Sequence, residues 1–214
     1  MPEVPEGRAG RIDTELQAAL ALFYRLEASP PVEAFRVGEE LYAALGIEAG
    51  GHREALLVHY DGEHTDLGLF ISDEIRSGAA SFLATLGEGE VDDLDAFCAA
   101  LEGVSHFVYF TFAGRARPVS RLELELQAEI DKFIFLRSVI GLSGADLVEK
   151  LFDRFTIHAQ AAERYQVANR EARRYARWVD RAMAAGKAES VLSDVRRLYR
   201  MPMPRKLEHI ARAA

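Results

Sequence analysis

The sequence predicts an α+β protein that is predominantly helical, with a small antiparallel sheet and an all-helical C-terminal third. Three observations predict this class. Residues 54–71 have the pattern of a β-hairpin, residues 104–112 are dense in Val, Phe and Tyr, and most other segments repeat apolar residues at helical spacing. With 214 residues and 49% apolar content, the chain can bury a sizeable core.

The first 45 residues predict two helices. Residues 1–11 are rich in Pro, Gly and charge, so a flexible N-terminus is expected there. A helix follows from about residue 13 to residue 28, because apolar residues recur at its inward positions. Pro30 and Pro31 end it, and a second helix is expected over residues 32–45.

The hairpin consists of two β-rich runs, 54–60 and 65–71, which flank the type I′ turn pair Asp61-Gly62. Gly68 lies inside the second run and indicates a bulge or a close backbone approach. A helix capped by Ser72 or Asp73 follows the hairpin.

A loop at residues 87–90 leads into a short helix that is expected to end at Gly103. Residues 104–112 then read as a central strand, because both of its faces would carry aromatic side chains.

A long helix is expected from residue 120 to residue 140. Pro118 restricts the chain before it, and Ser120 and Glu123 have the spacing of a capping box. The alternation over residues 122–126 is also typical of a strand, but the helical spacing continues far beyond it. The expected core positions are Leu122, Leu126, Ile130, Phe133 and Ile140.

The remaining residues predict only helices. A short one begins near Ser143, a long one spans 161–185, and a third spans 189–200. Residues 201–204 are expected to form a loop, and residues 205–212 one or two last helical turns.

Charge divides the chain unevenly. Residues 150–214 hold 15 Lys+Arg against 7 Asp+Glu, whereas residues 1–149 hold 11 against 27. We therefore expect a flexible segment 1–11, an acidic α+β body 12–150 and a basic helical extension 151–214 packed on the body, as one structural unit. The extension either docks on its own acidic body, which is the simpler interpretation, or binds an anionic partner.

The cytoplasm is the expected compartment. Cys98 is the only cysteine, so no disulfide can form within the chain, and it is expected to be a packed thiol. The N-terminus has no apolar region typical of a secretory signal, and no run of about 18 apolar residues predicts a membrane span.

Catalytic and cofactor motifs are absent from the sequence. No phosphate-binding glycine loop, nucleophile elbow or kinase-type loop occurs, and the six histidines fit no zinc or di-iron spacing. His59 and His64 flank the hairpin turn as an incomplete pair. The sequence therefore predicts no cofactor, no metal and no recognised enzymatic activity.

One polar cluster stands out on the long helix. Glu125 and Glu129 are four residues apart, so they share a face at the edge of the apolar stripe. His106 and Tyr109 from the preceding segment could lie near them. Either the carboxylates bind a cation or share a proton, or they form ion pairs with Lys132 and arginines of the extension; we favour the ion pairs.

An arginine stripe stands out on the helix at 161–185. Its four members share one face, opposite the apolar stripe, with Arg173 and Trp178 on its flanks; the members are Arg170, Arg174, Arg177 and Arg181. Arginine binds carboxylates and phosphates, and a neighbouring tryptophan can stack on a base. A solvated face, or pairing with the acidic body, is the simpler interpretation.

The function expected from these features is that of a non-enzymatic interaction or adaptor protein that binds another protein through the arginine-lined helix. Nucleic acid is the less favoured partner, a homodimer is also compatible with the sequence, and no membrane association is expected. Two alternatives remain: a nucleic-acid-associated factor that uses the same stripe, and an enzyme of unrecognised type centred on Glu125, Glu129 and His106.

Overall fold

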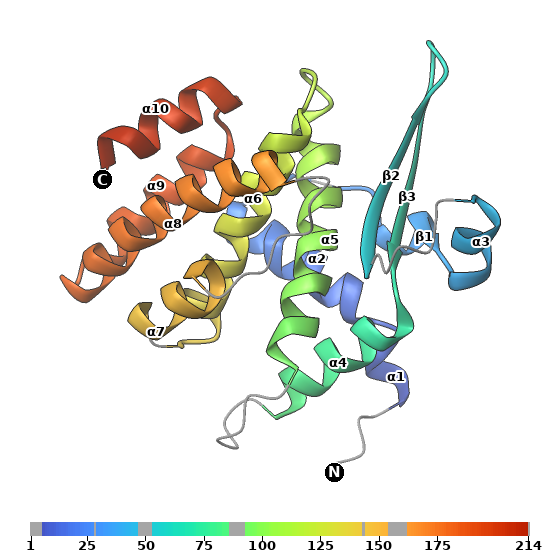
Figure 1. Cartoon of the computed structure of the whole chain (residues 1–214), viewed down its shortest axis with the longest axis horizontal. Helices are drawn as coiled ribbons and strands as arrows, with labels where there is room; N and C mark the ends of the chain where they lie inside the picture. The colour runs from blue at the N-terminus through green and yellow to red at the C-terminus, as the bar shows by residue number, and fades with distance from the viewer. Residues whose placement is uncertain are drawn as a thin grey trace. The chain divides into compact units, whose positions relative to one another are not determined.

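The computed structural model describes residues 6–27, 29–46, 53–85, 93–142, 144–153 and 162–213, and it confirms a predominantly helical α+β fold. The chain forms two compact units, Met1–Phe112 and Ala113–Ala214 (Figure 1). This division lies before the long helix, whereas the change of charge along the sequence lies near residue 150.

The first unit begins with α1 (Glu6–Ala9) and α2 (Ile12–Tyr24). The helical turn α1 lies where a flexible segment was expected. Ile12, Leu16 and Leu20 are almost fully buried on α2, as their spacing of four residues predicts. Arg25 then takes a left-handed conformation with φ 51°, which ends the helix earlier than expected. Residue 28, its expected end, lies outside the described residues.

The single helix expected at residues 32–45 is wrong. This segment forms a short 3₁₀ helix η1 (Val32–Phe35), a two-residue strand β1 (Arg36–Val37) and α3 (Glu39–Ala44). The tertiary contacts explain the break. Arg36 forms an ion pair with Asp13, with Nε and Oδ2 2.7 Å apart. The buried Val37 pairs with Phe70 in the sheet.

The predicted hairpin is confirmed as β2 (Glu54–Tyr60) and β3 (Thr65–Ile71). The strand order is β1-β3-β2; β2 is antiparallel to β3 and β1 is parallel, so the sheet is mixed rather than wholly antiparallel. Gly68 allows the expected close approach, because a Cβ there would lie 2.7 Å from Val37 Cγ2.

The hairpin connection is longer than the two-residue turn expected from Asp61-Gly62. Residues 61–64 lie between the strands, and Asp61 Oδ1 accepts hydrogen bonds from the backbone N–H groups of Glu63 and His64 at 2.9 and 2.7 Å. Helix α4 (Asp73–Ala84) follows, and Ser72 Oγ accepts a hydrogen bond from Ile75 N as its N-cap. The loop expected at residues 87–90 lies outside the described residues.

The central strand predicted at residues 104–112 is wrong, because these residues form the second half of α5 (Leu94–Ala113). Gly103 lies inside this helix and does not end it. Residues 103–109 are all buried, so their apolar side chains surround the helix and show no helical period. In a segment of this kind, Val, Phe and Tyr mislead because tertiary packing overrides their β propensity.

Helix α5 is long and apolar enough to cross a membrane by length and composition. The central helix of a folded domain meets the same criterion, and most of α5 is buried in the structure.

The second unit begins with α6 (Arg121–Ile134), which continues as a π-helical segment η2 (Phe135–Val139). This confirms the expected long helix and its start, since Ser120 Oγ accepts a hydrogen bond from Glu123 N at 3.2 Å. Leu126, Ile130 and Phe133 are at most 2% exposed, as predicted.

Five further segments complete the second unit and confirm its all-helical character. Helix α10 begins at Met203 rather than after residue 204, because proline is tolerated in the first turn of a helix. The segments are α7 (Gly144–Val148), the π-helical η3 (Glu149–Asp153), α8 (Ala162–Ala184), α9 (Ala188–Tyr199) and α10 (Met203–Ala213). Residues 143 and 161, the expected starts of two helices, lie outside the described residues.

Candidate functional site

The arginine stripe lies on an exposed face of α8. Arg170, Arg174, Arg177 and Arg181 are all exposed, whereas Ala168, Ala172, Tyr175 and Val179 on the opposite side are buried. The helix therefore has the two faces that its sequence predicts, and the basic face is open to solvent.

The arginines of the stripe make mostly local contacts. Arg170 Nε lies 2.8 Å from Glu171 Oε1, its sequence neighbour. Arg174 Nη2 donates to the backbone oxygen of Ala211 on α10 at 3.1 Å, and Arg181 Nε donates to the backbone oxygen of Arg177 at 3.2 Å. Among the described residues of the second unit, no carboxylate pairs with Arg174, Arg177 or Arg181.

The two residues that flank the stripe are less accessible. Trp178 is half-buried, and its ring stacks on Tyr175 with centroids 5.4 Å apart and planes 23° apart. Arg173 is also half-buried. Because one face of Trp178 already stacks on Tyr175 of the same helix, the indole offers a base only its other face.

A polar cluster that the sequence did not predict joins α8, α9 and α10. Asp194 Oδ2 accepts a hydrogen bond from Tyr175 Oη at 2.8 Å and lies 2.8 Å from His209 Nε2, while Arg197 Nη2 donates to Oδ1 at 2.6 Å. Burial raises the pKa of Asp194, but these three hydrogen bonds outweigh it and leave the pKa lowered. Burial and the nearby Asp194 carboxylate raise the pKa of Tyr175 well above its usual value.

Glu125 and Glu129 of α6 are both buried and form ion pairs in the second unit. Lys132 Nζ donates to Glu129 Oε1 at 2.8 Å, and Arg164 Nε lies 3.9 Å from Glu125 Oε1. Within the described residues of the second unit, Lys132 and Arg164 thus form ion pairs with Glu129 and Glu125, as the favoured interpretation expects.

A fully buried lysine, which the sequence analysis missed, lies beside the same helix. Lys206 of α10 donates to Gln127 Oε1, and Gln127 Nε2 donates to Asp131 Oδ1 at 2.7 Å. Burial lowers the pKa of Lys206 to about 7, although the nearby carboxylates of Glu123 and Asp131 oppose the shift. This chain of hydrogen bonds fixes α10 to α6.

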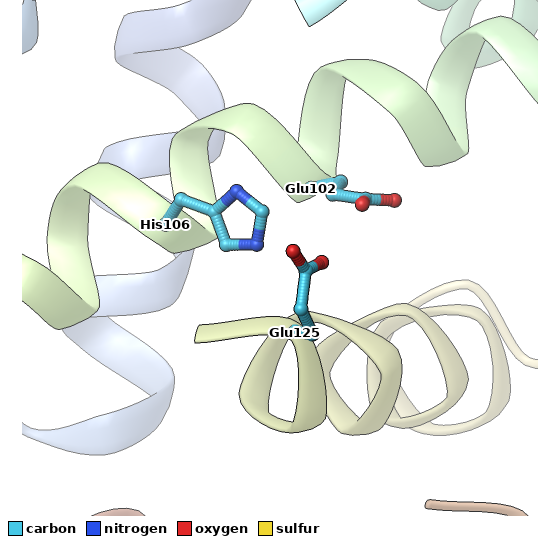
Figure 2. A group of neighbouring side chains, drawn as sticks. All are labelled: Glu102, His106 and Glu125. Atoms are coloured by element: carbon cyan, nitrogen blue, oxygen red, sulfur yellow. The ribbon is translucent and has the colours of Figure 1, made fainter. Parts of the chain in front are cut away.

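His106 and Tyr109, the other half of the predicted polar cluster, lie on α5 of the first unit and are buried. Figure 2 shows His106 one turn after Glu102 on the same helix. The third residue labelled there, Glu125, belongs to α6 of the second unit and is described above with that unit. His106 Nδ1 lies 3.8 Å from Glu54 Oε2, which comes from β2. Glu54 and Glu102 were not singled out in the sequence, because no motif marks them.

Comparisons with known proteins give no family and no relative. The chain matches no protein family model, no curated protein and no solved structure.

Proposed function

We propose that this protein is a non-enzymatic interaction protein whose second unit binds an acidic segment of a partner protein through the arginine face of α8. The observation that carries this proposal is that the exposed Arg174, Arg177 and Arg181 have no carboxylate partner among the described residues of their unit. Guanidinium groups that are already solvent-exposed can bind carboxylates without first breaking a buried ion pair.

The size and rigidity of the face suit a short acidic helix or strand. Arg170 to Arg181 spans about three turns, or about 16 Å at 1.5 Å per residue. The partly buried polar cluster around Asp194 holds α8 against α9 and α10, so the arginines project from a supported helix. A preformed surface reduces the entropy that binding must overcome.

A protein partner fits this surface better than single-stranded nucleic acid. Sequence-tolerant binding of single strands uses aromatic rings that stack on bases, and Trp178, the only tryptophan of the chain, is stacked on Tyr175. The ion pairs of Glu125 and Glu129 likewise favour a structural role over catalysis for these carboxylates. The proposal includes a cytoplasmic location, which rests on the single cysteine of the sequence.

The test is charge reversal on the stripe. Full-length protein with Arg174→Glu and Arg177→Glu should lose a partner recovered from the native cell, and should keep its thermal unfolding temperature as followed by Trp178 fluorescence. Arg121→Glu with Arg205→Glu is the matched control, because it reverses two other exposed arginines of the same unit. The control should retain the partner.

Three results would contradict the proposal. Equal loss of the partner in the control would mean that only net charge matters. A lower unfolding temperature in the stripe variant, with partner binding unchanged, would mean that the stripe stabilises the protein itself. Retention on DNA or RNA of any sequence, with affinity falling steeply with salt, would favour the nucleic-acid alternative.

A further inference from the structure

Strand β2 is an edge strand of the sheet in the first unit. In the order β1-β3-β2 it pairs with β3 alone, and its other side has no strand among the described residues. Two backbone hydrogen bonds fix which of its residues face β3, because Ser72 N donates to Arg53 O at 3.0 Å and Asp61 N donates to His64 O at 3.3 Å. The register between these two pairs has no bulge, so the odd-numbered residues of β2 are the ones bonded to β3.

The even-numbered residues of β2 therefore direct their backbone groups to the open edge. Along an antiparallel strand, successive residues place their N–H and C=O groups on alternate sides. The backbone groups of Leu56, Val58 and Tyr60 thus point away from β3, and no backbone partner for them lies in the described part of the chain. Such a row of donors and acceptors is a template for another strand.

The usual protection of an edge strand is missing from β2. Native edges carry charged side chains, prolines or bulges that prevent further pairing, whereas residues 55–60 include no Asp, Glu, Lys, Arg or Pro. Val58 is 46% exposed and Tyr60 is 67% exposed, and alternation places both on the same sheet face as Leu56. This edge therefore offers apolar side chains together with its open backbone groups.

The turn end of the hairpin lacks a third strand. Figure 1 shows it extending beyond α3 and α4, and β1 pairs only with Leu69 and Phe70 at the other end of β3. A two-stranded ribbon is only marginally stable in water, and further strands stabilise it. An added strand along β2 would supply them.

We propose that β2 pairs with β2 of a second copy of this chain, antiparallel and about a twofold axis at Val58, so that the two sheets become one. In this register Val58 lies opposite Val58 of the other copy, and Leu56 lies opposite Tyr60. The outward N–H and C=O groups of these three residues are then all hydrogen-bonded, and the pairs that meet across the axis are apolar or aromatic. This edge belongs to the first unit and is a different surface from the arginine face of α8.

Charge favours a second copy in this orientation. Antiparallel pairing brings the turn of one copy, with its exposed Asp61 and Glu63, toward Arg53 at the start of β2 in the other. Arg53 is accessible there, because its ion pair with Asp95 is itself exposed. Parallel pairing would instead place the two acidic turns side by side, and like charges directly opposite each other destabilise a sheet.

The first measurement is sedimentation equilibrium of the full-length protein across micromolar concentrations, where we expect a dimer. Val58→Lys should raise the dissociation constant of the dimer at least about tenfold, because two lysines would then lie opposite each other at the twofold axis. Leu22→Lys is the matched control, since it places the same charge at an 80% exposed position of α2 in the same unit and should leave the dimer unchanged. The proposal is overturned if the unsubstituted chain is a monomer throughout, or if the two variants weaken the dimer equally.

A cross-link tests the register without the lysine variant. In a Cys98→Ser background, Val58→Cys should give a disulfide-linked dimer on mild oxidation, because the Cα atoms of a directly opposite bonded pair are about 5.5 Å apart. Tyr60→Cys is the control, since this position is more exposed but its two copies would lie four residues apart along the paired strands, about 14 Å. Absence of a cross-link in Val58→Cys, or a cross-link of equal yield in Tyr60→Cys, would overturn the pairing at Val58.

Discussion

At the scale of residues, the sequence predicted exposure better than it predicted partners. The positions of the four stripe arginines on one face follow from their spacing alone, because helical periodicity is a local property. Lys206 and Gln127 are 79 positions apart, and Tyr175 and Asp194 are 19 apart, so no local pattern marks either pair. Such contacts depend on which helices pack together, which one sequence does not specify.

The lowered pKa of Lys206 predicts that the stability of the protein depends on pH. Its pKa of about 7 in the folded protein lies below the ordinary value of 10.5, so between these values the unfolded chain holds a proton that the folded protein has released. The contribution of Lys206 to stability should therefore rise with pH across this window, and below pH 7 its burial should destabilise the fold fully. Relative to Lys206→Met, the wild-type free energy of unfolding should increase by a few kcal/mol from pH 7 to pH 10, at about 1.4 kcal/mol per pKa unit.

Urea unfolding followed by Trp178 fluorescence measures this difference, since the only tryptophan lies in the same unit as Lys206. Groups that titrate in both proteins cancel in the comparison. Parallel pH profiles for the wild type and Lys206→Met would show that Lys206 stays protonated in the folded protein throughout this range.

At the scale of elements, hydrophobic periodicity predicted the secondary structure correctly where a segment buries one face. It predicted the wrong structure where a segment is buried on all sides. The hairpin strands were predicted at the residues where they occur, because β-rich runs flank a turn sequence. The ends of α8 were each predicted to within one residue, because this helix has one clearly polar face and one clearly apolar face. α5 was mistaken for a short helix and a strand, because residues 103–109 are buried all round and carry no period.

The same limit applies to the candidate site. The stripe on α8 could be predicted because it is one face of one helix. The group around His106 needs a helical α5 and a neighbouring β2, and the strand predicted at residues 104–112 would not have placed Glu102 and His106 one turn apart. Because residues 104–112 were predicted as a strand, the sequence did not indicate that Glu102 and His106 lie close together.

The contact of α7 with α8 makes a prediction about Gly144. A Cβ on Gly144 would lie 1.7 Å from Asp180 Oδ1 and 2.2 Å from its Cγ, and this carboxylate is also held by Arg137, with Nε and Oδ1 3.1 Å apart. Gly144→Ala must therefore separate the two helices or break the ion pair, and we expect a loss of about 1–3 kcal/mol of stability. The measurement is chemical denaturation followed by Trp178 fluorescence.

Asp180→Ala provides the control for this prediction, because it removes the carboxylate that the new methyl group would meet. In that background, Gly144→Ala should cost little, since alanine is a better helix former than glycine. An equal cost in both backgrounds would mean that the space beside Asp180 does not limit this position.

At the scale of the whole molecule, charge and compactness divide the chain at different places. The sequence becomes basic near residue 150, whereas the compact units meet in the chain at Phe112 and Ala113. The pattern of charge along the sequence reflects mainly which residues face solvent. The boundary between the compact units depends instead on which apolar faces pack together. The basic extension shares its core with α6, a helix whose buried face carries four acidic residues, so charge alone could not locate the boundary.

If each unit has its own core, damage to one should leave the other intact. Leu126 of α6 is fully buried in the second unit, and Leu126→Ala should cost about 2–5 kcal/mol. Hydrogen exchange followed by mass spectrometry should then show faster exchange in α6 and α8, with β3 and α4 of the first unit unchanged, because each domain opens around its own core.

Leu22→Ala is the control, since Leu22 is 80% exposed in the first unit and its loss should change exchange in neither unit. If β3 and α4 also exchange faster in Leu126→Ala, the two units unfold as one cooperative body.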